Sequence, residues 1–436
     1  MMKHYINLER PHLMNPSMNV ILKADFKGVF DESVFRKAVT ELANAYAILR
    51  ATVQIDEKGR AYFLSADANE IPVKILVGGT SFEQLVLSEN QKMFDLEKES
   101  MLRIFVMPLP AAFSVVFISH HLLGDGKSSI MLMESLCRAY MGMKLDYVGI
   151  QLIKDSDNFP KDSEPSELSK LHFGKLNKAW RKDARIFSFG DYKKMFTAYH
   201  KERETGIYLM SFNAVETRKA FHRCKNLDIT LDSGVVAAFM YAQKEIDERH
   251  REHLDKIGIE VDIRKELNFD ASKLIGNYAS AFSIEYGKTG KDNFGKVAVK
   301  VHKQLKKKMK SPKEKWLCLH AVDWVDGSLM DAGYFSQYGD FENKTAQKCA
   351  KMMGYEGAPM ELGVTNLGKL LMFIPPELIL ESVVFVPPAA PGNDITIGVV
   401  TYQGIMRLAV MYQASFVRRD TVKEIVWRAK ELLIKE

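Results

Sequence analysis

The 436-residue sequence lacks the features that mark several large protein classes. It has no run of about 18 uncharged apolar residues, so a membrane-spanning helix is not expected. Residues 1–16 mix charged and apolar side chains and offer no apolar core for a secretory signal peptide. The formal charge of +6, from 61 basic and 55 acidic residues, is small for this length and does not suggest a nucleic-acid-binding protein.

Cysteine is also scarce. The four cysteines, Cys137, Cys224, Cys318 and Cys349, are scattered without the spacing of a disulfide framework or a metal site. We interpret them as buried thiols of a reducing compartment, so the expected location is the cytoplasm. Neither a metal ion nor a tightly bound cofactor is expected.

Lysine is concentrated in one stretch, because seven of residues 303–315 are lysines. The simplest interpretation is a solvated helix end and loop, since charge runs usually face water. The alternative is that the stretch attracts a phosphorylated cofactor or an acidic carrier protein.

Apolar spacing predicts alternating strands and helices in both halves of the chain. Strands are expected at residues 19–26, 49–54, 61–64, 102–108, 113–119, 206–212, 257–263 and 382–386, with a hairpin of 395–402 and 405–412. Helices are expected at residues 31–46, 82–92, 128–140, 214–224, 230–246, 294–309 and 421–433.

This pattern predicts an α/β protein with two lobes. Residues 155–169 are rich in Asp, Ser, Glu, Lys and Pro, which indicates an interdomain linker that continues loosely to about residue 204. The expected division is therefore an N-terminal lobe at 1–154, a linker or crossover at 155–204 and a C-terminal lobe at 205–436.

The apolar strand expected at residues 113–119 ends in two adjacent histidines, His120 and His121, before a Gly-Asp-Gly turn. Adjacent residues at a strand end point to opposite faces, so the two rings cannot easily serve one site. That argues against a metal site built from both histidines and Asp125. One histidine should face a substrate, where an ordinary pKa of about 6.5 suits a proton acceptor near neutral pH.

The turn belongs to a longer motif, because residues 120–126 read His-His-Leu-Leu-Gly-Asp-Gly. Accompanying segments are 47–52 (Ala-Ile-Leu-Arg-Ala-Thr), 261–264 (Val-Asp-Ile-Arg), 275–280 (Ile-Gly-Asn-Tyr-Ala-Ser) and 364–368 (Val-Thr-Asn-Leu-Gly). Together they resemble the chloramphenicol acetyltransferase-like superfamily, which includes peptide-synthetase condensation domains, alcohol acetyltransferases and plant acyltransferases. The resemblance implies two lobes, each a mixed sheet with flanking helices, and an active-site channel between them.

The resemblance also assigns roles within the motif. His121 is the expected general base and His120 has a supporting role. Asp125 is expected to point away from the substrate and to pair with an arginine, rather than to orient the histidine as in a catalytic triad. Arg50 and Arg264 are the two candidates, and Arg264 is slightly favoured because a partner from the second lobe would also fix the lobe interface.

Small and polar residues of the matching segments complete the expected site. Gly126 should leave room beside the histidine for a narrow substrate channel. By resemblance, Asn277, Ser280, Thr365 and Asn366 line the channel or the lobe crossover, and one of them is a candidate hydrogen-bond donor to the developing oxyanion. Hydrogen bonding to the backbone in turns and at strand ends explains each of them equally well.

The expected activity is transfer of an acyl group from acyl-CoA, a co-substrate, to an alcohol or amine. No acyl-enzyme is expected, because no serine or cysteine adjoins His121 in the motif. One alternative is a stand-alone condensation enzyme that takes acyl groups from a carrier-protein thioester, supplied in trans because the sequence has no phosphopantetheine attachment segment. Another is a catalytically silent recruitment module on the same fold. The expected partners are thus an acyl-CoA or acyl carrier protein and a small-molecule acceptor, without nucleic acid or a membrane span.

Overall fold

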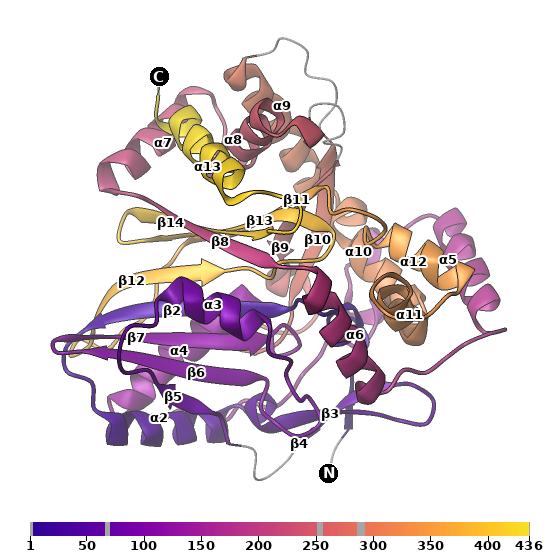
Figure 1. The fold of residues 1–436 in the computed structure, drawn as a ribbon, viewed down its shortest axis with the longest axis horizontal. Coiled ribbons are helices and arrows are strands. Elements are labelled where there is room, and N and C mark those ends of the chain that lie inside the picture. The colour runs from indigo at the N-terminus through magenta and orange to yellow at the C-terminus, as the bar shows by residue number, and fades with distance from the viewer. Residues whose placement is uncertain (1–2, 66–69, 251–255, 286–292, 436) are drawn as a thin grey trace.

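The computed structural model describes residues 3–65, 70–250, 256–285 and 293–435, whose strands form three sheets (Figure 1). The five-stranded sheet has the order β12 (Ile379–Val386), β2 (Asn19–Lys27), β7 (Ala112–His120), β6 (Leu102–Leu109), β5 (Val73–Ile75). The six-stranded sheet has the order β10 (Ala279–Glu285), β9 (Lys256–Asp262), β11 (Glu361–Lys369), β13 (Asn393–Tyr402), β14 (Ile405–Gln413), β8 (Thr205–Phe212). A small sheet joins β1 (Lys3–Tyr5), β4 (Ala61–Ser65) and β3 (Ala51–Ile55).

The N-terminal lobe is built on the five-stranded sheet, with helices α2 (Glu32–Ala45) and α4 (Gly126–Tyr140) packed together and α4 against β2. Asp31 caps α2, because its side chain accepts a hydrogen bond from the Val34 N–H at 3.0 Å. The apolar run in β7 is buried from Val115 onward, as a strand covered on both faces requires. Helix α3 (Phe82–Asn90) completes this lobe.

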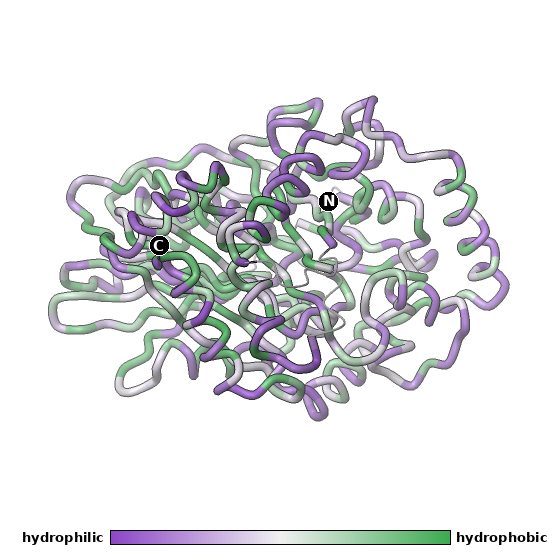
Figure 2. Tube along the Cα trace, turned by 90° about the horizontal axis from the view of Figure 1, so that it is seen from above, coloured by the Kyte–Doolittle hydropathy of each residue, from purple (hydrophilic) through white to green (hydrophobic). Residues whose placement is uncertain are grey.

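The C-terminal lobe surrounds the six-stranded sheet. Helices α7 (Ala214–Asn226), α8 (Leu231–Ile246) and α13 (Arg419–Ile434) lie together above the sheet in Figure 1, and α9 (Phe294–Lys310) packs against α8. The predicted hairpin is present as β13 and β14, which turn at Gln403 and Gly404, both with positive φ. Figure 2 shows hydrophobic chain concentrated in the strands and hydrophilic chain along the outer helices.

The two lobes share a strand. Strand β12 comes from the C-terminal part of the chain but pairs antiparallel with β2, from Ile379 opposite Lys27 to Val386 opposite Ile21. Figure 1 shows it beside the N-terminal sheet. The five-stranded sheet is therefore completed by chain from both sides of the expected linker.

Helices α5 (Glu167–Trp180) and α6 (Phe189–Glu202) occupy most of the expected linker or crossover at residues 155–204, although the sequence pattern there did not predict helices. Helix α6 begins with a capping box of Ser188 and Asp191. Its apolar residues are buried at helical spacing: Tyr192, Met195, Phe196 and Tyr199. Helix α5 buries only Phe173 and Trp180, so its apolar pattern is weak in the sequence.

Three helices that were not predicted from apolar spacing lie between β10 and β11. They are α10 (Pro312–Trp324), α11 (Gly327–Tyr338) and α12 (Lys344–Met352). Together with α5 they form a layer at the right of Figure 1. The short helix α1 (Arg10–Leu13) contacts α11 and connects this layer to the N-terminal lobe.

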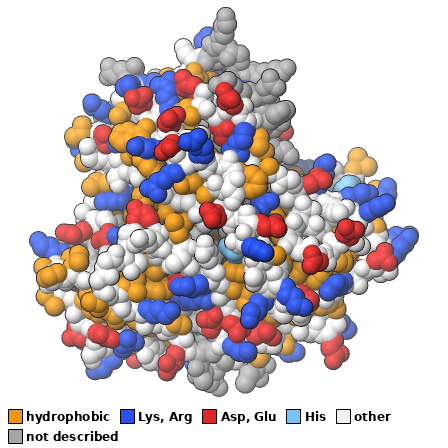
Figure 3. All heavy atoms as spheres, in the orientation of Figure 1, with side chains coloured by type: hydrophobic (Ala, Val, Ile, Leu, Met, Phe, Trp, Pro, Cys, Tyr) orange, Lys and Arg blue, Asp and Glu red, His pale blue; other side chains and the backbone are white. Residues whose placement is uncertain are grey.

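The surface shown in Figure 3 has basic and acidic side chains interspersed, in keeping with the small net charge. Of the helices in the described residues, none has the length and apolar character needed to cross a lipid bilayer.

Candidate functional site

Backbone hydrogen bonds hold the two motif histidines at the point where β7 ends. The His120 N–H donates to the Met101 carbonyl and the His121 N–H to the Met18 carbonyl, both at 2.9 Å. The Leu123 N–H closes a turn onto the His120 carbonyl, also at 2.9 Å. The chain therefore leaves the sheet in a fixed direction before α4 begins.

Asp125 caps α4 and binds the second lobe at the same time. Its Oδ1 accepts a hydrogen bond from the Ser128 N–H at 2.9 Å. The Arg264 guanidinium donates to both carboxylate oxygens, at 2.7 and 2.9 Å, and the Tyr278 N–H donates to Oδ2 at 3.0 Å. Of the two arginines considered from the sequence, Arg264 occupies this place, whereas Arg50 is not bonded to Asp125.

The Asp125–Arg264 pair is a buried ion pair, with each residue 7% exposed. Burial alone would raise the pKa of the Asp125 carboxyl, but the charge of Arg264 and the hydrogen bonds from Arg264, Ser128 and Tyr278 keep that pKa below its usual value. None of these bonds goes to His121. The aspartate is thus ionised and occupied by the lobe interface rather than orienting the histidine.

Ser128 and Gly124 bring the motif against the loop at Gly276. The Ser128 hydroxyl donates to the Gly276 carbonyl at 2.8 Å and accepts from the Gly276 N–H at 3.1 Å. A Cβ on Gly124 would lie 2.6 Å from the Ser128 Cβ and 3.0 Å from the Gly276 carbonyl oxygen, so only glycine allows this approach. Sequence reasoning missed both residues, since their partner lies in a distant loop.

Close packing is a second reason for glycine at position 126. A Cβ there would lie 2.9 Å from both Leu367 of β11 and Phe385 of β12. Glycine therefore allows these two side chains to approach the start of α4, and the expected channel beside the histidine stays a prediction.

His120 is buried in a neutral form. Its Nδ1 accepts a hydrogen bond from the Leu122 N–H at 3.2 Å, so the proton of the neutral ring is on Nε2, which is buried without a partner. The ring meets Phe94 edge-on, with centroids 5.9 Å apart. Burial, followed by the charges of His121 and Arg103, lowers the pKa of His120 to about 3.

His121 stacks on a third histidine. The rings of His121 and His12 lie 4.3 Å apart between centroids with an interplanar angle of 4°. His12 belongs to α1, and its Nε2 accepts a hydrogen bond from Asn277 Nδ2 at 2.8 Å. Burial, and then the charges of His121 and His120, keep the pKa of His12 well below its usual value. His12 is therefore a neutral ring that fixes one face of His121.

Three polar atoms of this cluster are buried without hydrogen-bond partners: His121 Nδ1, His12 Nδ1 and Asn277 Oδ1. His121 is 7% exposed, and its Nε2 is not among the fully buried unpartnered atoms of the described residues. The ring thus has one fully enclosed edge, at Nδ1, and one edge, at Nε2, that is not fully enclosed. We name His12, His121 and Asn277 the imidazole cluster.

The other candidate channel residues have different surroundings. The Ser280 hydroxyl donates to the Lys315 carbonyl at 2.5 Å. The Asn366 amide donates to Asp232 at 3.0 Å, and its oxygen accepts from the Gly368 N–H at 2.8 Å. Thr365 is buried on β11, opposite Gly398 of β13. Of the four candidates, Asn277 is the one bonded to a residue that contacts His121.

Sequence reasoning missed His12. It lies 109 positions before His121, in a helix of only four residues, and neither its spacing nor a periodic pattern predicts the contact. Pro11 at the start of α1 is the one local signal, because proline is favoured in the first turn of a helix.

A buried cluster of Asp247, His250 and Asp394 has ligand atoms close enough for a metal ion. Arg249, however, donates to Asp247 at 2.7 Å and to Asp394 at 3.1 Å, and Gln243 also donates to Asp394. His250 Nε2 lies 2.6 Å from Asp394. The guanidinium already supplies a cation here, so we describe the cluster as an ion-pair network.

Comparisons with known proteins match part of the sequence and the whole fold. The family model of the condensation domain matches residues 12–148. Tyrocidine synthase 3 from Brevibacillus parabrevis is 25% identical over 158 residues, which cover 34% of this chain and 2% of that much longer protein.

Solved structures resemble the chain over nearly its full length. Trichothecene 15-O-acetyltransferase from Fusarium sporotrichioides has a TM-score of 0.69 at 14% identity and covers 98% of this chain and 94% of its own. Polyketide synthase associated protein 5 from Mycobacterium tuberculosis has a TM-score of 0.63 at 12% identity, with coverages of 100% and 98%. The first condensation domain of the CDA synthetase has a TM-score of 0.63 at 11% identity, with coverages of 100% and 97%. The resemblance recognised in the sequence is therefore confirmed at the level of the fold: the chain has the two-lobed fold of these condensation-domain and acetyltransferase structures, and its residues 12–148 match the condensation-domain family model.

Proposed function

We propose that the chain is an acyltransferase in which His121 is the general base. It moves an acyl group from a CoA thioester to the hydroxyl or amine of a small molecule. The observation that carries this proposal is the environment of His121, whose Nδ1 edge is enclosed while its Nε2 edge is not. The motif aspartate is bound to Arg264, so the imidazole is left to act without a triad.

The proton inventory of the site suits this role. For Nε2 to accept a proton, the neutral His121 ring must carry its own proton on Nδ1, the atom that is shielded from solvent. The lowered pKa values of His12 and His120 keep both neighbouring rings uncharged near neutral pH. When His121 gains a proton during the reaction, it is therefore the only one of these three rings that is positively charged.

The reaction needs one proton transfer in each direction. His121 Nε2 takes the proton of the acceptor O–H or N–H as that atom attacks the thioester carbonyl and forms a tetrahedral oxyanion. The intermediate collapses with cleavage of the C–S bond, and the leaving thiolate receives the proton from Nε2. The products are an ester or amide and free CoA. A general base contributes about 10²–10⁴-fold, and alignment of the two substrates supplies much of the remainder.

Direct transfer is favoured because the serine closest to His121 in the sequence is hydrogen-bonded and three of the four cysteines are protonated at neutral pH. The Ser119 hydroxyl, two residues before His121, donates to the Val20 carbonyl at 2.9 Å. Burial raises the pKa of the Cys137 and Cys349 thiols to about 12 and that of Cys224 to about 11, so these groups are not thiolates at neutral pH.

A carrier-protein thioester is the second candidate donor, favoured by the condensation-domain match over residues 12–148. The chemistry at His121 is the same for both donors, because both present a thioester on a phosphopantetheine arm. The two differ in what binds at the surface, so the donor is a matter for experiment.

Release of free thiol, followed with a chromogenic aromatic disulfide reagent, tests the proposal. The protein is incubated with acetyl-CoA or a longer acyl-CoA and a panel of alcohols and amines, and in parallel with an acylated carrier protein. We expect turnover with one donor class and a loss of at least about 10²-fold in His121→Ala, with an unchanged urea unfolding curve. An equally active His121→Ala variant contradicts the assignment. Carrier-protein binding without turnover by any donor indicates a silent recruitment module.

A further inference from the structure

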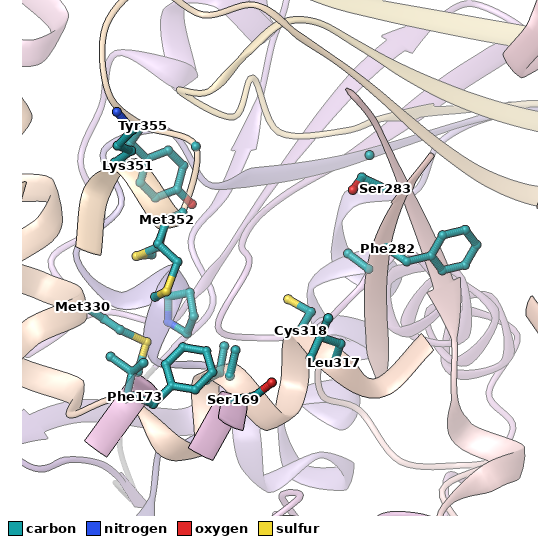
Figure 4. Close-up of a pocket in the computed structure, with 18 of the residues that line it drawn as sticks. Ser169, Phe173, Phe282, Ser283, Leu317, Cys318, Met330, Lys351, Met352 and Tyr355 are labelled. Carbon is teal, nitrogen blue, oxygen red and sulfur yellow. The ribbon is translucent and has the colours of Figure 1, made fainter. Parts of the chain in front are cut away.

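A large cavity lies between helices α5, α10, α11 and α12 and the edge of the six-stranded sheet, with Pro11 of α1 in its wall. Its volume is about 830 Å³, which falls within the range of about 300–1,000 Å³ typical of small-molecule sites. In Figure 4, Phe173, Met330 and Met352 lie across the space from Leu317 and Cys318. Most of this wall is apolar, and methionine side chains adapt to ligands of different shape.

The cavity opens at the surface and has Pro11 in its wall. Leu168, Leu317 and Met352 line it and are exposed, so they mark its mouth. Pro11 also lines it and immediately precedes His12, the ring stacked on His121. The wall of the cavity is therefore continuous in sequence with the short helix that carries His12.

Gly258 of β9 leaves part of the cavity unfilled. A Cβ built on it would have no heavy atom within 4 Å, although its neighbours Ile257 and Ile259 are buried. Ser283, its partner across β10, lines the same cavity. Glycine within a strand gives up packing and strand stability, and it often marks a place where a ligand approaches the backbone.

Charge at the mouth is balanced. Lys308 pairs with Glu314 at 3.2 Å, and Lys351 pairs with Glu356 at 3.3 Å. Neither lysine is left as an uncompensated cation for a phosphate. The mostly apolar wall also offers few partners to the amide groups of a phosphopantetheine arm. The chemistry that fits is an uncharged aliphatic chain or ring.

We propose that this cavity binds the aliphatic part of a substrate, which is either the acyl chain of the donor or the carbon body of the acceptor. The inference rests on the proposed acyl transfer at His121 and adds its substrate class. It assigns Gly258 as the residue that determines how much chain the cavity admits.

Binding of a fluorescent aliphatic probe, 11-(dansylamino)undecanoic acid, tests the cavity without turnover. Gly258→Leu places a side chain in the open space, and we expect it to weaken probe binding at least tenfold and to abolish displacement by 1-decanol. Gly174→Leu is the matched control, because Gly174 is exposed on α5 and also has no atom within 4 Å of an added Cβ. It should bind the probe like the wild type. Equal affinity in Gly258→Leu and wild type overturns the inference.

Cys318 provides a second readout in the unmodified protein. It lines the cavity and is exposed, whereas Cys137, Cys224 and Cys349 are buried. Saturating 1-decanol should slow labelling of Cys318 by N-ethylmaleimide at least severalfold, as measured by mass spectrometry. Unchanged labelling at saturation places the decanol elsewhere and overturns the inference.

Turnover identifies which substrate part enters the cavity. Acyl-CoA chains of increasing length are compared with one short alcohol, and alkanols of increasing length with acetyl-CoA. Gly258→Leu should shift the preference to shorter chains in the series that uses the cavity, and no shift in either series contradicts a substrate role. His121→Ala should retain probe binding, so its loss of turnover reports on the proposed function and the probe reports on the cavity.

Discussion

The loop between β7 and α4 contains two polar clusters that are built in opposite ways. At its Asp125 end, both carboxylate oxygens accept hydrogen bonds, a guanidinium from the other lobe balances the charge, and of these groups Arg264 Nε is left without a partner. At its histidine end, the imidazole cluster has three buried polar atoms without partners. Unsatisfied buried groups cost stability, so proteins keep few of them and often at functional sites. The comparison separates the part of the motif that fixes the lobes from the part that is available for chemistry.

Removing one member of the ion pair should have the largest effect. Asp125→Ala strands the Arg264 guanidinium in a buried site, which we expect to cost about 3–5 kcal/mol of unfolding free energy in urea denaturation. Asp262→Asn removes a partly exposed partner of the same arginine, so its cost should be about 1 kcal/mol or less. Similar losses in both variants would mean that the Asp125 end does not have the structural role described.

Acid should weaken the histidine end before it weakens the aspartate end. The pKa of His120 is about 3 in the folded chain and about 6.5 when the chain unfolds, so only the unfolded state takes up its proton between these values. Its contribution to stability is present above pH 6.5 and is lost as the pH falls towards 3, at about 1.4 kcal/mol per pH unit. The lowered pKa of Asp125 acts in the same direction only below its unfolded value of about 3.9.

His120→Asn tests this order, because an asparagine oxygen can still accept from the Leu122 N–H but has no proton to gain. Urea unfolding between pH 7 and pH 4 should show a smaller loss of stability in the variant than in the wild type. Parallel curves would show that His120 is not the group that titrates.

The smallest effect should come from His12, which positions His121 without reacting. His12→Phe keeps an aromatic ring against His121, whereas His12→Ala removes it. We expect His12→Ala to lower kcat by about tenfold with little change in KM, and His12→Phe to lower it less, because small misplacements of a base reduce rate. The pH dependence of kcat should also shift in His12→Ala, since an ionised His121 then gains water in place of a neutral ring. If His12→Ala lowered only the free energy of unfolding and left kcat and its pH dependence unchanged, the role of His12 would be limited to packing.

The sequence predicted the parts of the molecule that depend on local pattern. The apolar strand ending at His120, the helix capped by Asp31 and the hairpin at Gln403 follow from spacing, capping and turn chemistry. The motif and its accompanying segments indicated Asp125 and two candidate arginines, and only the fold decides for Arg264 over Arg50. The contact of His12 with His121 was not predictable, because a four-residue helix carries no periodic signal.

Helices α5 and α10–α12 were missed for a different reason. Helix α5 buries only Phe173 and Trp180, and Leu168 and Leu171 are exposed, so its apolar residues do not mark one buried face. Its partners lie in a part of the chain about 150 residues away, as in the hydrogen bond of Asn177 to the Trp324 carbonyl. The cavity that these helices enclose is a tertiary feature. The open space at Gly258 is visible only in the folded chain, where its surroundings are known.

The pairing of β12 with β2 has a consequence for synthesis on the ribosome. The N-terminal sheet cannot be completed until residue 386 has left the exit tunnel, so β2 remains an unpaired edge while more than 350 residues are added. Unpaired strand edges are templates for association with other chains. A nascent chain of this protein is therefore most vulnerable to aggregation while its first lobe is folded except for one strand. A variant truncated before Ile379 never gains that strand, so its edge at β2 should stay unpaired.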